Sequence, residues 1–128
     1  MENFAGKHIL IVEDSKINQK ILQKILDTWG IESSVANNGY EAIYLTERNS
    51  YDMVLMDLKM PEMDGFKTTS IIRDPNSAVL NHDVTIVALT GEASEESYNR
   101  SFEVGMNYFI PKPYTKETLQ ETFAKIFI

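Results

Sequence analysis

The chain has 128 residues, a hydrophobic fraction of 43% and a formal net charge of −7. This length fits one domain with its own core, and no apolar run approaches the roughly 20 residues that span a bilayer. The negative charge argues against a direct nucleic-acid surface, because phosphate contacts need clustered Lys and Arg. The lack of cysteine excludes disulfides and thiolate metal sites, and residues 1–7 show no signal-peptide pattern. These features favour a cytoplasmic protein that contacts neither nucleic acid nor membrane.

The first predicted strand is the apolar run His8–Val12, which ends at Glu13 and Asp14. A run without polar alternation is typical of a strand buried on both faces of a parallel sheet. Asp14 or Ser15 is the predicted cap of the helix that follows, and Gly30 ends it. The apolar residues of this helix recur at helical spacing: Ile17, Ile21, Leu22, Ile25, Leu26 and Trp29.

The next segment predicts a weaker strand and a short helix. Glu32–Ala36 indicates a strand near an edge of the sheet. Asn38 followed by Glu41 resembles a capping box, which predicts a second helix that includes residues 42–45. Three aromatic residues of this part of the chain are assigned to packing: Trp29, Tyr40 and Tyr44.

The central predicted strand is the apolar run Met53–Met56, which ends at Asp57. A turn over residues 61–65 and a helix over Phe66–Arg73 follow it. Asp57 therefore lies at the carboxyl end of a buried strand, where the ligand sites of open α/β sheets lie. A carboxylate in this place can be a nucleophile, a metal ligand or a helix cap.

The second half of the chain continues the alternation. Val84–Leu89 predicts a buried strand ending at Thr90, and Asn107–Ile110 predicts a short strand before Lys112. Two helices complete the pattern, one from Ser94 to near Gly105 and one after the cap Thr115. Strands that alternate with helices predict a parallel sheet with right-handed crossovers, and five such units give a three-layer α/β sandwich. We expect residues 1–128 to form one domain, and the apolar end of the chain is typical of a segment of a longer protein.

Polar side chains lie at the ends of four of these strands: Glu13 with Asp14, Asp57, Thr90 and Lys112. Because the carboxyl ends of parallel strands share one edge, we expect these residues to meet in one cleft. Three carboxylates close together repel one another, and a divalent cation relieves that repulsion. Ligation by oxygen alone indicates Mg²⁺.

These groups suit phosphoryl transfer. The cation, Lys112 and the Thr90 hydroxyl can neutralise the three oxygens of a phosphoryl group while Asp57 attacks phosphorus and becomes an aspartyl phosphate. No segment resembles an ATP-binding Gly-rich loop, so the expected donor is a phosphorylated side chain on another protein. His8 and His82 lie outside this set and are interpreted as bystanders.

In this order and on these strand ends, the motifs resemble a response regulator receiver domain of two-component signalling, over essentially the whole chain. The resemblance rests on Glu13-Asp14, on Asp57 in the segment 56–65, on Thr90 after Ala88-Leu89, and on Lys112-Pro113. It implies the flavodoxin-like strand order 2-1-3-4-5. It also implies phosphorylation of Asp57 by the phosphohistidine of a histidine kinase or histidine phosphotransfer protein. The run 13–19 is similar to the receivers of hybrid histidine kinases.

The resemblance further implies that Asp14, Asp57 and the backbone carbonyl of Lys59 hold Mg²⁺, with Glu13 acting through water. Phosphorylation is expected to draw Thr90 toward Asp57 and to let Phe109 rotate inward as a switch. An output domain or a second copy of the chain would then bind the face around Phe109. Simple core packing explains Phe109 equally well.

We expect the Lys112–Pro113 peptide bond to be cis. The cis form of an X–Pro bond lies only about 0.5–1 kcal/mol above trans, and a sharp turn there would let Lys112 reach back to Asp57.

Three alternatives share part of this pattern. A phosphatase of the haloacid-dehalogenase type needs a second Asp two residues after its nucleophile, where this chain has Lys59. A flavin-binding module needs a phosphate loop after the first strand, and Glu13-Asp14 would repel a phosphate there. A receiver-like module that only binds partners would lack one of the key residues, and none is missing. We therefore expect a signalling switch that catalyses only its own phosphorylation and dephosphorylation, not a metabolic enzyme.

Overall fold

The computed structural model describes residues 4–127, so residues 1–3 and 128 of the predicted domain lie outside the described part. Within it, five parallel strands form one sheet in the order β2-β1-β3-β4-β5, which confirms the predicted order. The strands are β1 His8–Val12, β2 Glu32–Ala36, β3 Met53–Asp57, β4 Ile86–Thr90 and β5 Tyr108–Pro111.

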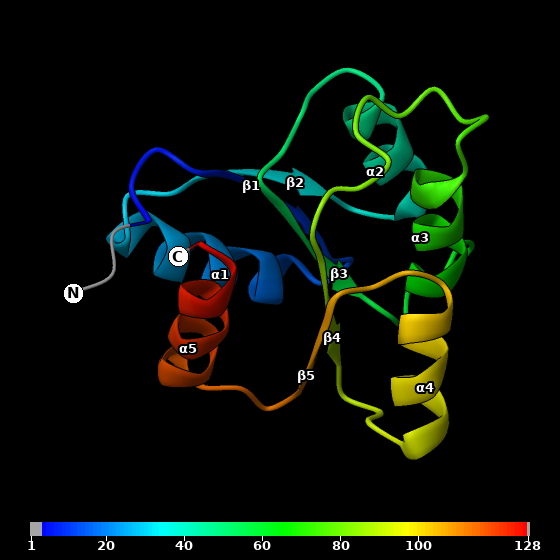
Figure 1. Ribbon diagram of the computed structural model, residues 1–128. Coiled ribbons are helices and arrows are strands. Elements are labelled where there is room, and N and C mark those ends of the chain that lie inside the picture. The colour runs from blue at the N-terminus through cyan, green and yellow to red at the C-terminus, as the bar shows by residue number, and fades with distance from the viewer. Residues whose placement is uncertain (1–3, 128) are drawn as a thin grey trace.

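Helices cover both faces of the sheet, as a three-layer sandwich requires. They are α1 Lys16–Thr28, α2 Gly39–Thr46, α3 Gly65–Arg73, α4 Glu95–Glu103 and α5 Lys116–Ile126. Helices α1 and α5 lie on one face, and α2, α3 and α4 lie on the other (Figure 1). Between residues 4 and 127, no helix has both the length and the apolar character needed to cross a membrane.

Two cores result, one on each face of the sheet. On the α1–α5 side, alternate residues of the strands pack against Leu22, Leu26 and Phe123. On the other side, the remaining strand residues pack against Phe66 and Ile72 of α3. Residues of β3 alternate between the two cores and all five are buried, which places β3 at the centre of the molecule.

Helix α1 begins and ends at the predicted residues. The Ser15 hydroxyl caps it by accepting a hydrogen bond from Asn18 N at 3.3 Å. At the other end Gly30 has φ 72°, the left-handed conformation that glycine adopts at low cost. The Gly30 and Ile31 N–H groups then bond to the Asp27 and Leu26 carbonyls at 3.0 and 3.1 Å, as in a Schellman motif.

The buried stripe of α1 differs from its apolar pattern. Gln19, Leu22 and Leu26 are its buried residues. Ile17 and Ile21 are 73% and 48% exposed. The helix is rotated so that the polar Gln19 faces inward near the carboxyl edge of the sheet, where it bonds to the Glu13 carbonyl and to Asn37.

Helix α2 begins at its predicted cap, because Glu41 N donates to Asn38 Oδ1 at 2.8 Å. The assignment of Tyr40 and Tyr44 to packing is wrong, since these side chains are 57% and 56% exposed. They lie on the outer face of a short helix whose inner face carries Gly39 and Ala42.

Trp29, in contrast, packs as predicted. Its ring meets those of Phe4 and Phe123 edge-to-face, both at centroid distances of 5.5 Å.

The strands β4 and β5 each begin later than their apolar patterns suggest. Ile86 N donates to the Asn107 side-chain oxygen at 2.9 Å, and Asn107 N donates to Ile86 O at 2.9 Å. This exchange turns the backbone before β5, so the strand begins at Tyr108. The strand extends to Pro111, opposite Thr90, which is tolerated because β5 is an edge strand.

Candidate functional site

Asp57 is the last residue of β3 and is 6% exposed. Its Oδ1 atom accepts a hydrogen bond from Lys59 N at 3.2 Å, which fixes the turn after the strand. Helix α3 begins close to this turn at Gly65. A Cβ atom at that position would lie 2.5 Å from the Asp57 carbonyl oxygen, so only glycine fits there. The prediction that a buried strand ends at Asp57 is confirmed.

Glu13 follows β1 and faces the same cleft, with 2% of its surface exposed. Its carboxylate accepts a hydrogen bond from Ser15 N at 3.1 Å and another from Lys112 Nζ at 3.2 Å. One carboxylate oxygen from each of Glu13, Asp14 and Asp57 can be chosen so that all lie within 4.8 Å of one another. The structure therefore brings together the three carboxylates that the sequence predicted to meet.

Burial and charge change the protonation of this cluster. Burial, followed by the charge of Glu13, raises the pKa of Asp57 to about 7, although Lys112 opposes the shift. Burial also acts to raise the pKa of Glu13. The Ser15 N–H, the bond with Asp57 and the charge of Lys112 together lower it instead. Without a cation, Asp57 thus takes up a proton at a higher pH than a free aspartate does.

Lys112 comes directly after β5 and reaches across β4 to the cluster. Its ammonium group lies 3.2 Å from Glu13 Oε1 and 3.9 Å from Asp57 Oδ1. Its backbone N–H donates to Thr90 O at 2.6 Å. The Lys112–Pro113 peptide bond is cis, as predicted.

Thr90 ends β4 beside the carboxylates, but its hydroxyl is engaged elsewhere. Ala88 packs in the core under α2 and α3, so Thr90, two residues on, leaves the strand on that side. Leu55 packs in the core on the α1–α5 side, so Asp57, two residues further along β3, leaves its strand on that opposite side. The Thr90 hydroxyl accepts a hydrogen bond from Glu92 N at 3.0 Å. Thr90 is buried near the site and tied to the loop after β4.

An exposed ion pair joins two of the loops that follow the strands at this edge of the sheet. Lys59 Nζ, from the loop after β3, lies 2.6 Å from Glu92 Oε1, in the loop after β4. This pair raises the pKa of Lys59 through the hydrogen bond to Glu92 and its charge. The two side chains remain 75% and 70% exposed.

Phe109 lies opposite Ala88 in β5 and is half-buried. Its ring meets that of Tyr98 in α4 edge-to-face at a centroid distance of 5.3 Å. Tyr98 in turn meets Phe102 at 4.9 Å, and these two side chains are 49% and 40% exposed. Phe109 therefore packs partly against the core and partly against a surface aromatic cluster.

Comparison with known families shows to which family the chain belongs. Residues 9–124 match the model of the response regulator receiver domain. The chain belongs to the response regulator receiver domain family. The family is a signalling domain rather than a classical enzyme.

Receivers similar to this one are parts of larger proteins. The chain is 42% identical over 114 residues to hybrid signal transduction histidine kinase B of Dictyostelium discoideum, covering 82% of the chain and 6% of that protein. It is 34% identical over 120 residues to transcription factor SKN7 of Saccharomyces cerevisiae, covering 94% of the chain and 18% of that protein. The chain thus spans less than a fifth of the length of either relative.

A solved structure resembles this receiver along almost all of its length. It is the receiver domain of sensor histidine kinase PA1611 from Pseudomonas aeruginosa PAO1, with a magnesium ion coordinated in its active site cleft. It is 32% identical with a TM-score of 0.85, and the match covers 96% of this chain and 98% of that one. The cluster of Glu13, Asp14 and Asp57 offers only oxygen ligands and concentrated negative charge, so it fits a hard divalent cation such as Mg²⁺.

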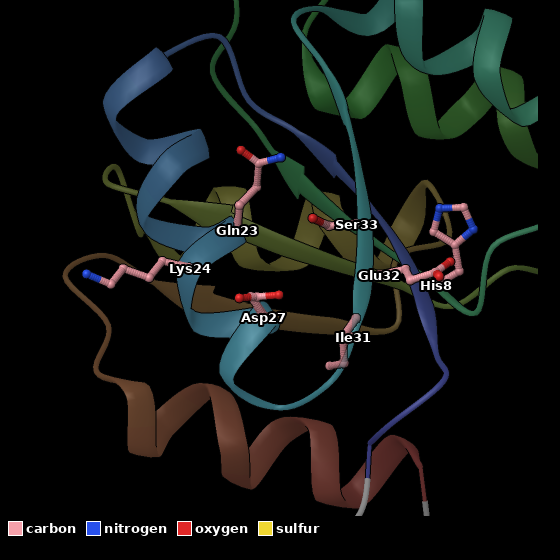
Figure 2. A pocket seen from close by; sticks show the side chains of 7 residues that line it. All are labelled: His8, Gln23, Lys24, Asp27, Ile31, Glu32 and Ser33. Carbon is pink, nitrogen blue, oxygen red and sulfur yellow. The ribbon is translucent and has the colours of Figure 1, made fainter.

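An open pocket lies elsewhere on this receiver, away from the carboxylates. It has a volume of about 670 Å³ and lies between α1, β2 and the start of β1 (Figure 2). Its walls mix single charges of both signs, including Lys24, Asp27 and Glu32. His8 also lines it, at the opposite end of β1 from Glu13, so this histidine is remote from the carboxylates as predicted.

Sequence reasoning missed two residues beside the cleft. Tyr114 follows the cis proline, and burial, followed by the charges of Glu13 and Asp57, raises its pKa to about 12. Nothing in the sequence around Tyr114 predicts that this residue lies near Glu13 and Asp57. Gln19 is 5% exposed and donates a hydrogen bond to the Glu13 carbonyl. It could have been found as the polar residue one turn before Leu22 and two turns before Leu26 in the buried stripe.

Proposed function

We propose that Asp57 of this receiver accepts a phosphoryl group from a phosphohistidine on a histidine kinase or histidine phosphotransfer protein. The observation that carries the proposal is the convergence of three carboxylates and Lys112 at one edge of the sheet. In the transfer, a carboxylate oxygen of Asp57 forms a bond to phosphorus while the bond from phosphorus to the donor imidazole nitrogen breaks. The imidazole leaves with the electron pair of that bond. Hydrolysis by water later returns the carboxylate and releases inorganic phosphate.

The residues of the cleft divide this task. Asp57 must be unprotonated to attack, and Lys112 favours that form from 3.9 Å away. Glu13 holds Lys112 in place from the other side, at 3.2 Å. When a phosphoryl group occupies the cleft, the Lys112 ammonium can bond one of its oxygens and the Thr90 hydroxyl another.

Glu13, Asp14, Asp57 and the Lys59 carbonyl are the groups that would hold Mg²⁺. When bound, the cation neutralises the crowded carboxylates and the charge on the transferring phosphoryl oxygens. The Lys59 N–H bonds to Asp57 Oδ1, which places the backbone of Lys59 beside the carboxylates, while its exposed side chain pairs with Glu92. Lys59 also occupies the position at which a haloacid-dehalogenase phosphatase needs its acid/base Asp, which disfavours that alternative.

We propose that the output follows from Thr90. A phosphoryl group offers Thr90 a stronger acceptor, which competes with the bond between its hydroxyl and Glu92 N. Movement of Thr90 would release the start of α4 and let Phe109 change its contact with Tyr98. The face made by α4 and β5 would then bind an output domain or a second copy of the chain.

The phosphoacceptor is tested by intact mass after incubation with acetyl phosphate and Mg²⁺. We expect one added phosphoryl group on the wild type and on Asp27→Asn, a matched change of an exposed residue on α1. We expect none on Asp57→Asn. Full labelling of Asp57→Asn, or equal labelling of the wild type in excess chelator, would overturn the proposal.

A further inference from the structure

A buried amide lies beneath the carboxylate cluster. Gln19 Nε2 donates to the Glu13 carbonyl oxygen at 2.5 Å and to Asn37 Oδ1 at 2.8 Å. Both amide hydrogens are therefore used, and the side chain is 5% exposed. These bonds join α1, the end of β1 and the turn after β2.

The orientation of the two amides is fixed by their partners. Asn37 N and Nδ2 both donate to Glu41 Oε1, at 2.9 and 2.8 Å, and a carboxylate can only accept. Asn37 Oδ1 also accepts from Lys16 Nζ at 2.5 Å, and an ammonium can only donate. A flipped Gln19 would place its oxygen against two other oxygens. Only one orientation of the Gln19 and Asn37 side-chain amides therefore satisfies these hydrogen bonds.

The turn that carries Asn37 is itself anchored. Its next residue, Asn38, caps α2. The residue after that is Gly39, where a Cβ atom would collide with Thr68 Oγ1 and the Met63 sulfur. The turn therefore packs closely against α3 and the loop after β3. Asn37 can therefore keep the Gln19 side chain in the position from which it bonds to the Glu13 carbonyl.

We propose that Gln19 is a positioning residue for the cation-binding carboxylates, acting through Asn37. The Glu13 carbonyl belongs to the same planar peptide unit as the Asp14 N–H. Glu13 N already donates to Ala36 O at 3.1 Å. With the carbonyl held as well, the backbone of Glu13 is bonded on both sides, which restricts the orientation of the peptide unit that leads to Asp14. The inference rests on the proposed Mg²⁺ site.

The test measures Mg²⁺ affinity by isothermal titration calorimetry. We expect Gln19→Met, which keeps the length of the side chain but removes both donors, to weaken Mg²⁺ binding about 10-fold, the lower end for loss of a group that orients metal ligands. Gln23→Met is the matched control, because Gln23 lies one turn further along α1 and lines the open cavity of Figure 2. It should change the affinity less than 2-fold.

Loss of stability must be separated from loss of positioning. Leu26→Ala removes a fully buried side chain of the same helix, so it should destabilise the fold and leave the Mg²⁺ affinity of the folded protein unchanged. Asn37→Ala provides a second variant at a less buried position, with a 3-fold or greater loss of affinity expected, and it decides the matter if Gln19→Met does not fold. A metal-free ¹⁵N spectrum should show the Asp14 amide displaced by Gln19→Met and unmoved by Gln23→Met.

Two failures are distinguishable. If the wild type binds no Mg²⁺, the proposed metal site is wrong and Gln19 has no cation to position. If the wild type binds Mg²⁺ and both Gln19→Met and Asn37→Ala bind it equally well, the positioning role alone is overturned. Equal loss of affinity in Leu26→Ala would also overturn it, because general destabilisation would then explain the effect.

Discussion

The two sides of the Asp57 cleft are held by different kinds of contact. On the cation side, which comprises Glu13, Asp14 and the amides of Gln19 and Asn37, Glu13 is 2% exposed and its carbonyl and carboxylate both accept hydrogen bonds. The output side comprises Thr90, Glu92, α4 and Phe109. Within the described residues, α4 contributes Ser101 as its single buried residue.

We propose that this difference gives each side a separate task. Breaking a buried hydrogen bond leaves a desolvated polar group, which costs about 1–3 kcal/mol, whereas exposed ion pairs contribute little. Segments with few buried contacts also open locally at a low free energy. Phosphorylation adds about 1.5–2 negative charges at the point where the two sides meet. We therefore expect the cation side to stay in place while the output side changes.

The largest expected effect is that of Lys112, which links the two sides. Lys112→Met removes the cation beside Glu13 and Asp57, and we expect the rate of phosphorylation by acetyl phosphate to fall at least about 100-fold. Lys116→Met, at the exposed start of α5, is the control and should retain the wild-type rate. The measurement is phosphoprotein formed over time by mass spectrometry. A loss of less than 3-fold would show that the cation side works without Lys112.

The second effect is on stability and its pH dependence. Because the pKa of Asp57 is raised to about 7 in the folded protein, the native state binds more protons than the unfolded chain between pH 4 and 7. The metal-free protein should therefore lose stability as the pH rises from about 4 to about 7, and its stability should then level off. Asp57→Asn removes this loss, and we expect it to raise the free energy of unfolding by about 1–2 kcal/mol at pH 8, discounted for water that reaches the site.

Urea denaturation in chelator, at pH 4.5 and pH 8, measures this difference. The two proteins should differ little at pH 4.5, where Asp57 is protonated in the folded state. Mg²⁺ should stabilise the wild type at pH 8 more than Asp57→Asn, because it binds the native carboxylates. Equal stability of the two proteins at both pH values would mean that ionisation of the buried Asp57 carboxyl does not destabilise the fold.

The cation side and the output side also differ in how well the sequence predicted them. Asp57, Glu13 and Lys112 could be placed because each follows an apolar run, and parallel strands bring such ends to one edge. Thr90 could be placed in the same way, but not the bond of its hydroxyl to Glu92 N. That bond depends on the path of a loop, which no periodicity describes.

The errors have a common physical cause. Ile17, Ile21, Tyr40 and Tyr44 fit apolar patterns on α1 and α2 yet are exposed. Helical spacing identifies a stripe but not its rotation about the helix axis, which packing against the sheet decides. In α1 the inward face carries Gln19 together with Leu22 and Leu26, and the hydrogen-bond partners of Gln19 come from the end of β1 and from the turn after β2. Such long-range partners are not visible in a local sequence pattern.

The third effect concerns local stability. Because α1 buries Gln19, Leu22 and Leu26, we expect its central amides to exchange with deuterium at least about 10-fold more slowly than those of α4. Hydrogen exchange followed by NMR measures the ratio. Addition of Mg²⁺ and beryllofluoride, a mimic of the phosphoryl group, should change exchange in α4 more than in α1. Equal protection in both helices would remove the basis for assigning movement to the output side.

The Lys59–Glu92 ion pair should have the smallest effect, and it allows the most direct comparison of the two sides. The Lys59–Glu92 ion pair and the bond from Gln19 to the Glu13 carbonyl are of similar length, 2.6 and 2.5 Å, but only the second is buried. Lys59→Met should leave the urea midpoint unchanged within error, because water replaces the lost contact. Gln19→Met should lower the free energy of unfolding by about 1–3 kcal/mol, because the Glu13 carbonyl loses its donor in the interior. Equal shifts in the two variants would show that burial does not distinguish the sides, and that the output side is held as firmly as the cation side.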